Sequence, residues 1–320
     1  MKKIYIAATA CAAILVLTAC GKNNQKSLKI SIDDQVDLVK SSSDEEFYNV
    51  NIELENTSKK AVQIEEIEVI DSSDNEIEPE FSSDRGAFNT SKIQADKTAK
   101  GFLSLPLDKD KDYTLVVNYH ESDNDNKDLE SKIQFNTKNV NDVEEKFKNA
   151  LNTYLDIVVK GKEIDDNAKS LLSNDLSKEV SSYDTSLLSS VSKYTFDKYS
   201  LTDTDKQGIL KAMKELYAKN NFEIESGAVT TEKANFEVMI PMIDWTKDDS
   251  YNKFVDSLKE KYSSSSSSLS YNERQKNIQK DLAKKLPELI KNSDLDTSNT
   301  KEMDITVVYN SDDKKYEVKS

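Results

Sequence analysis

Two hydrophobic patterns follow one another along the chain, and the change falls near residue 140. Before that point apolar residues alternate with polar ones, as at Tyr48, Val50, Ile52 and Leu54. Beyond it, apolar residues recur every three or four positions. A period of two predicts strands with one buried face, and a period of 3.6 predicts amphipathic helices. We therefore expect two domains, one all-β over 28–137 and one containing helices over 142–320.

The first domain is predicted to contain about seven short strands, the number and spacing typical of an antiparallel β-sandwich. The alternation changes parity at Glu65-Glu66, which predicts a β-bulge or a strand that changes sheets. Polar clusters separate the alternating runs, which are Leu28–Ile32, Tyr48–Leu54, Val62–Ile64, Ile67–Val69, Phe102–Leu107, Tyr113–Tyr119 and Leu129–Phe135.

The second domain is predicted to be α+β, with helices leading into a small antiparallel sheet. Its first helix carries an apolar stripe from Val143 to Val158, and we expect Asn141 to cap it and Gly161 to end it. A second long helix is expected over 206–219, with shorter helical stretches between 164 and 196. The remaining predicted elements are strands over 222–230 and 234–245, helices around 251–258 and 278–286, and a hairpin of 303–309 with 315–318.

The first twenty residues form a different kind of segment. Lys2 and Lys3 precede an apolar run from Ile4 to Val16, which is too short for a spanning helix and is typical of a secretory signal. Leu17-Thr18-Ala19-Cys20 resembles the lipobox of bacterial lipoprotein precursors. The resemblance implies a signal peptide over 1–19, a diacylglyceryl group on the Cys20 sulfur and a lipid-anchored linker over 20–27. The alternative is an ordinary signal peptide or membrane anchor with an incidental cysteine.

The predicted anchor places the protein at the outer face of the cytoplasmic membrane, because two acyl chains hold a protein on a bilayer almost permanently. The stretch from Val50 to Val62 resembles the strand-turn-strand unit of immunoglobulin-like domains in Gram-positive surface lipoproteins. Residues 142–320 resemble an uncharacterised family of C-terminal lipoprotein domains. That resemblance implies a cystatin-like roll, in which a curved antiparallel sheet cradles a long helix, and it brings no assigned activity.

Composition removes several kinds of chemistry. Cys11 lies in the predicted signal and Cys20 would carry lipid, so the folded domains contain no thiol and no cysteine zinc site. The single histidine, His120, ends a predicted strand and is expected to be exposed there, and no cofactor or metal is expected. A formal net charge of −15 repels phosphates, so no nucleic acid partner is expected.

Two acidic loops have partial calcium-loop patterns. Asp203-Thr204-Asp205-Lys206-Gln207-Gly208 matches the first half of such a loop, but Lys214 occupies the position that should supply a bidentate carboxylate. Helix capping is therefore the preferred interpretation of both aspartates. The second loop, Asp123-Asn124-Asp125-Asn126-Lys127, fails earlier because it has no glycine.

Two further features of the second domain have a plain and a functional interpretation. Trp245 is predicted to be a core residue at the end of a strand, with a sugar-stacking platform as the alternative. The serine run Ser263–Ser268 is predicted to be a mobile loop between two helices, with a glycosylated or adhesive patch as the alternative. Ser270 and Glu273 are predicted to form a capping box at the start of the helix that follows.

The favoured hypothesis is a non-enzymatic surface lipoprotein that binds an envelope protein, a peptide or a glycan, with the membrane contacted only through the lipid. The alternative is a cell-envelope hydrolase that uses two carboxylates of the second domain, because such pairs suffice for glycoside hydrolysis. No catalytic pair is marked by the sequence. A polar pocket with facing carboxylates would favour hydrolysis, and a roll packed with Tyr and Phe would favour binding.

Overall fold

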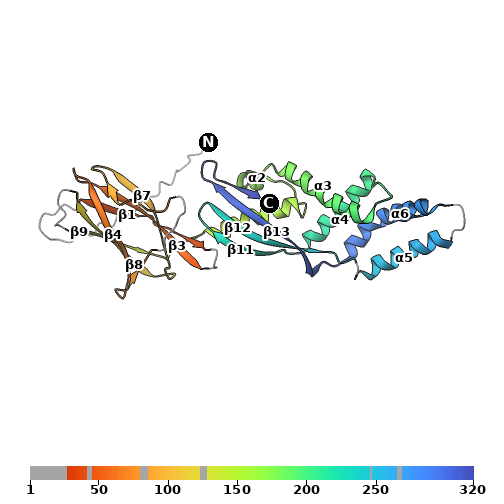
Figure 1. Ribbon diagram of the computed structural model, residues 1–320, viewed down its shortest axis with the longest axis horizontal. Coiled ribbons are helices and arrows are strands. Elements are labelled where there is room, and N and C mark those ends of the chain that lie inside the picture. Colours follow the sequence, from red (N-terminus) through yellow and green to blue (C-terminus); the bar gives the residue numbers. More distant parts are fainter. Residues whose placement is uncertain (1–26, 42–44, 80–85, 123–127, 246, 265–268) are drawn as a thin grey trace, which may run out of the picture. The chain divides into compact units, whose positions relative to one another are not determined.

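The computed structural model describes residues 27–41, 45–79, 86–122, 128–245, 247–264 and 269–320 (Figure 1). The chain divides into two compact units, 1–143 and 144–320. Two antiparallel sheet systems and, within the described residues, six helices form a two-domain, β-rich fold. The predicted signal peptide over 1–19, Cys20, most of the 20–27 linker and the acidic loop 123–127 lie outside the described residues.

The first sheet of the first unit is built around a long central strand, β3 (Glu46–Asn56). One edge of β3 pairs with β1 (Leu28–Ile32) and then with β2 (Val36–Lys40), and its other edge pairs with β7 (Thr98–Leu105). The short strand β10 (Val140–Asp142) runs parallel to β2. The sequence pattern did not predict β2 or β10, because each is short and depends on a partner far away in the chain.

The second sheet is built around β4 (Val62–Asp71) and β8 (Asp112–Glu121). β9 (Leu129–Asn136) pairs with the other edge of β8, while β5 (Glu76–Ile77) and β6 (Lys92–Ile93) pair with the other edge of β4. The register between β4 and β8 shifts between Ile64 and Glu66, which confirms the bulge predicted from the parity change. Apolar residues of both sheets, such as Val50, Leu54, Val69 and Leu115, form one buried core.

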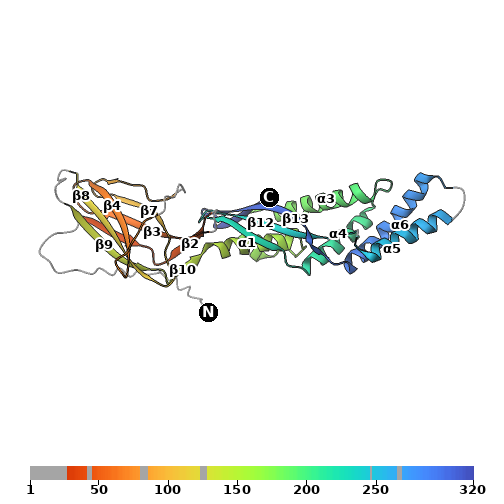
Figure 2. The ribbon, with the colours of Figure 1, turned by 60° about the horizontal axis from the view of Figure 1, so that its bottom comes forward.

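The sheet of the second unit has the order β11 (Glu223–Val229), β12 (Lys233–Met242), β13 (Asp296–Asn310) and β14 (Lys315–Lys319), all antiparallel. The helix α1 (Val143–Val158) runs along one face of this sheet (Figure 2), and the ring of Phe147 lies 5.2 Å from that of Tyr316. The predicted cap is wrong: Asn141 lies in β10, where its side-chain amide donates to Asp37. Gly161 follows α1 with a φ of 73°, as a residue ending a helix requires.

Five further helices complete the second unit. α2 (Asp166–Leu171), α3 (Leu176–Thr195) and α4 (Asp203–Ala218) follow α1, and α3 is longer than the short stretches that the sequence predicted. α5 (Asp249–Ser264) and α6 (Tyr271–Asn292) pack together between β12 and β13 in the chain. The predicted capping box at Ser270 and Glu273 is confirmed. The serine run enters the end of α5, and 265–268 lie outside the described residues.

Candidate functional site

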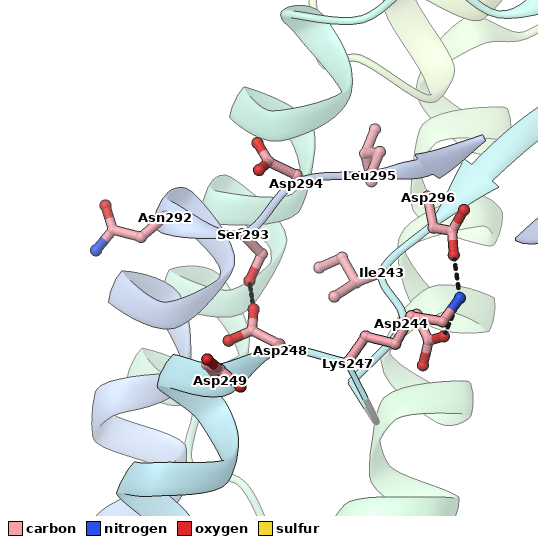
Figure 3. A pocket seen from close by; sticks show the side chains of 10 residues that line it. All are labelled: Ile243, Asp244, Lys247, Asp248, Asp249, Asn292, Ser293, Asp294, Leu295 and Asp296. Carbon is pink, nitrogen blue, oxygen red and sulfur yellow. Dashed lines mark hydrogen bonds and ion pairs between the residues drawn. The ribbon is translucent and has the colours of Figure 1, made fainter. Parts of the chain in front are cut away.

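An acidic pocket of about 380 Å³ lies where β12 passes into α5 and α6 passes into β13 (Figure 3). The helices α5 and α6 are inserted in the chain between β12 and β13, which are neighbours in the sheet. The segments that enter and leave this helix pair therefore both lie at the pocket. The carboxylates of the pocket come from these two connections and from the first residues of α5 and β13, Asp249 and Asp296. The charged side chains that line it are Asp244, Lys247, Asp248, Asp249, Asp294 and Asp296.

Several of these carboxylates already have structural partners. The ammonium of Lys247 lies 3.1 Å from a carboxylate oxygen of Asp244 and 2.9 Å from one of Asp296. Asp296 also accepts a hydrogen bond from the Ser298 hydroxyl. The hydroxyl of Ser293 lies 2.5 Å from Asp248. Figure 3 shows the contacts of Lys247 and the contact between Ser293 and Asp248 as two separate groups on opposite sides of the pocket.

The surroundings of Asp296 in the acidic pocket favour its ionised form. Hydrogen bonds from Ser298, together with the ammonium of Lys247, lower the pKa of Asp296 to about 2. Asp248 accepts the backbone N–H of Tyr251, as a residue before a helix commonly does. A general acid in glycoside hydrolysis needs the opposite shift, a carboxyl group whose pKa is raised toward neutrality. The aspartates of the pocket therefore act in the structure mainly as partners that hold the two connecting segments in place.

A second cavity, of about 300 Å³, lies between the helices and the sheet of the second unit. We call it the tyrosine–methionine cavity, after Tyr154, Tyr183, Tyr217, Met242 and Met303 in its lining. The remaining residues that line it are mainly aliphatic residues of α1, β12 and α3, serines of α3, Glu179, Lys301 and Ser320. It is therefore an apolar cavity with a small number of polar groups, the usual composition of a small-molecule site.

The tyrosines of this cavity are neutral hydroxyl groups at physiological pH. Burial raises the pKa of Tyr217 to about 12, and its hydroxyl lies 3.9 Å from the sulfur of Met242. Burial also raises the pKa of Tyr154 and of Tyr183. The hydroxyl of Tyr154 donates to Glu179 at 3.1 Å. The hydroxyl of Tyr183 can donate a hydrogen bond to a bound molecule, and none of the three tyrosines is poised to lose a proton.

His120 and Asp205, two candidate residues from the sequence, both have partners in the structure. His120 lies at the end of β8 with Nδ1 2.8 Å from Glu65, and its side chain is 15% exposed, so it is less exposed than predicted. Asp205 belongs to a capping box in which Thr202, and not an aspartate, is the N-cap of α4. Neither residue lines the acidic pocket or the tyrosine–methionine cavity.

Trp245 and Gly208 also differ from their predicted surroundings. β12 ends at Met242, so Trp245 lies beyond the strand, half-buried, with its ring 4.8 Å from that of Tyr251. Gly208 lies inside α4 at a close approach to α6, since a Cβ there would lie 3.1 Å from Pro287. Within the described residues, no group of three or more His, Cys, Asp or Glu side chains could hold a metal ion.

Sequence reasoning did not predict either cavity. Lys301 lies in a part of β13 before the predicted hairpin strand, and Tyr183 lies on a helix that was expected to be short. The available signal was the strict alternation of Lys301, Met303, Ile305 and Val307, which places a lysine on the same face as three apolar residues.

Comparison with solved structures finds a match that covers nearly the whole chain. The protein is similar to ycdA of Bacillus subtilis, provisionally classed as a lipoprotein, with 21% identity over 92% of this chain and 95% of that chain and a TM-score of 0.62. Two partial matches have much lower TM-scores. They are a PapD-like domain of human CEP192 (12% identity, 42% of this chain, 100% of that chain, TM-score 0.23) and a DUF4426 protein of Pseudomonas aeruginosa PAO1 (11% identity, 36% of this chain, 96% of that chain, TM-score 0.20).

The similarity to ycdA shows a shared fold across both units. No protein-family model matches the chain, and no curated protein matches it significantly. Among the residues that the structure describes, there is no helix with the length and apolar character needed to span a bilayer.

Proposed function

We propose that this protein is a lipoprotein anchored through Cys20 to the outer face of the cytoplasmic membrane, where its folded units bind an envelope component. The location is supported chiefly by the sequence Leu17-Thr18-Ala19-Cys20, which directly follows a short apolar run and precedes a polar segment. The provisional classification of ycdA as a lipoprotein supports it. Two acyl chains on one sulfur would supply the attachment without a spanning segment.

The finer fold assignment is part of this proposal. An immunoglobulin-like first unit is supported by its two packed sheets and by β10, which follows β9 and pairs in parallel with β2 of the other sheet. A cystatin-like second unit is supported by α1, whose apolar side chains lie against a four-stranded antiparallel sheet. Folds of both kinds host many unrelated functions, so the role has to be argued from the sites.

Binding is favoured over hydrolysis by the contacts of the carboxylates. The alternative role, a cell-envelope hydrolase, would need a protonated carboxyl group and a facing carboxylate in one pocket. In the acidic pocket, Asp244 and Asp296 share Lys247, and the pKa of Asp296 is lowered. The tyrosine–methionine cavity contains one glutamate in its lining, and that residue is bonded to Tyr154. The cavity therefore has the groups of a binding site and not of an acid-base pair.

The address is tested by fractionating cells that produce the native protein or the Cys20→Ala variant. We expect the native protein in the membrane fraction, released by detergent but not by high salt, and digested by protease added to intact cells. The variant should lose the lipid that gives this behaviour. A native protein that is found in the cytosol and is protected from external protease would contradict the proposal.

The binding role is tested by crosslinking on intact cells. We expect the native protein to give a crosslinked product containing an envelope component, and the Cys20→Ala variant to give less of it because it is not held at the surface. If the native protein gives no crosslinked product from either unit, the binding role loses its support while the address still stands.

A further inference from the structure

The sheet forms one wall of the tyrosine–methionine cavity. This wall lies at the end of the side chains of β12 and β13 that face the core. On β13 the side chains of Val307, Ile305, Met303 and Lys301 share one face, since residues two apart point the same way. Val307 and Ile305 are buried, Met303 is half-buried and Lys301 is exposed. Lys301 is paired in register with Ile240 of β12, which is 2% exposed. Burial along this face of β13 therefore decreases from Val307 to Lys301, while Ile240 of the neighbouring strand stays covered.

The roof of the cavity is α3, which is packed loosely for a helix of 20 residues. Leu176 is buried, whereas Tyr183 and Leu187, which line the cavity, are only half-buried. Ser182, Ser186 and Ser190 follow one another at helical spacing along the same side and also line it. Small side chains at these positions leave the space between α3 and the sheet unfilled.

Several polar groups in this cavity lack a partner among the described residues. The ammonium of Lys301 has no hydrogen bond or ion pair there. The hydroxyls of Tyr183, Ser182 and Ser186 have no hydrogen bond there either. The other charged group, the Glu179 carboxylate, already accepts the hydroxyl of Tyr154. The groups that remain free to bind a ligand are therefore the ammonium of Lys301 and hydroxyl donors, on an otherwise apolar and aromatic surface. This combination is complementary to an anion with an apolar body.

We infer that the tyrosine–methionine cavity binds a small carboxylate with an alkyl or aryl body, its carboxylate paired with Lys301 and its body held between Met303 and the tyrosine rings. This inference rests on the proposed binding function and names its ligand class. A volume of about 300 Å³ holds about ten non-hydrogen atoms at roughly 30 Å³ each. Methionine and tyrosine side chains suit such a body, because they adapt to its shape and contact aromatic rings favourably.

The first test uses 3-phenylpropionate as the probe, because it combines a carboxylate with an aryl body of the right size. Binding to the purified lipidated protein in phospholipid nanodiscs is measured by ligand-observed NMR, with 3-phenylpropanamide as the uncharged comparison and empty nanodiscs as background. We expect saturable binding of one carboxylate per chain and binding of the amide that is weaker by about tenfold or more, since a hydrogen bond to a charged group contributes about 1.5–3 kcal/mol.

Matched variants locate the site. Lys301→Gln should weaken carboxylate binding by about tenfold, whereas Lys233→Gln, an exposed lysine of β12 outside the cavity, should leave it unchanged. Ser186→Trp should fill the cavity and abolish binding. Ser189→Trp changes an exposed serine of the same helix that does not line the cavity, so it should bind like the native protein.

The inference is overturned if the carboxylate does not bind saturably at millimolar concentration, or if Lys301→Gln and Ser186→Trp both bind it as the native protein does. Circular dichroism of each variant establishes that it is folded. The fractionation of native protein and Cys20→Ala is independent of these results, so a cavity that binds nothing leaves the proposed address intact.

Discussion

Asn56 offers the most quantitative test of how the first unit is held together. Its side chain is fully buried at the end of β3, where Nδ2 lies 2.7 Å from the carbonyl oxygen of Lys60 and 3.1 Å from those of Ile93 and Gln94. Its Oδ1 accepts the backbone N–H of Ser58 at 3.0 Å. One amide thus joins the turn after β3 to the end of β6 and the residue that follows it.

Replacing this residue, Asn56→Ala, removes all of these hydrogen bonds at once. A buried group left without a partner costs about 1–3 kcal/mol, and the carbonyl of Ile93 is in that position. The partly buried bonds to Lys60 and Ser58 add about 1 kcal/mol each. We therefore expect the free energy of unfolding of the first unit to fall by about 3–5 kcal/mol.

The assay is urea denaturation followed by far-UV circular dichroism, with the fluorescence of Trp245, the one tryptophan of the chain, reporting on the second unit. Asn75→Ala is the matched control, because Asn75 is exposed and its side-chain amide donates to Asp71 at 2.9 Å. It should cost about 1 kcal/mol or less. Equal losses for the two variants would refute the reasoning.

Further predictions concern a glycine, a carboxylate and an ion pair. Gly101→Ala should destabilise the first unit by about 2 kcal/mol, because its Cβ would lie 2.7 Å from the backbone of Phe88; Gly227→Ala, whose nearest contact would be 3.7 Å, should be nearly neutral by the same denaturation assay. The pKa of Asp296 is lowered to about 2, so its stabilisation is present above the unfolded pKa and is lost as pH falls toward 2. Native protein and Asp296→Asn should therefore differ in urea midpoint at pH 7 and converge near pH 2; a constant difference would contradict this. Asp184→Ala should lower the free energy of unfolding by about 3 kcal/mol, because it leaves the partly buried ammonium of Lys214, which lies 2.7 Å from Asp184, without that partner. Asp203→Ala, which removes an exposed ion pair with Lys206, is the control. Equal stability of the two variants would show that the pair of Asp184 and Lys214 contributes nothing.

Local features of the fold could be predicted from the sequence because they depend on neighbouring residues. The bulge at Glu65-Glu66 follows from a change of alternation, and the capping box at Ser270 and Glu273 follows from spacing. The start of α4 was predicted only in part, because the sequence analysis assigned capping to Asp203 and Asp205, whereas Thr202 is the N-cap and Asp205 completes the capping box.

Features that depend on distant segments could not be predicted. β10 forms only because residues near 140 lie beside β2, and no local pattern encodes that pairing. The acidic pocket depends on two chain crossings about 50 residues apart, and the tyrosine–methionine cavity depends on how closely α3 approaches the sheet. A lysine on the apolar face of β13 was visible in the sequence, but the helices that leave it uncovered were not.

The central claim is that this protein is held at the cell surface by lipid on Cys20, and mass spectrometry of the intact native protein tests it most directly. The account predicts a chain that begins at Cys20 and carries the additional mass of a diacylglyceryl group. A chain that retains residues 1–19 with an unmodified Cys20 thiol would contradict it.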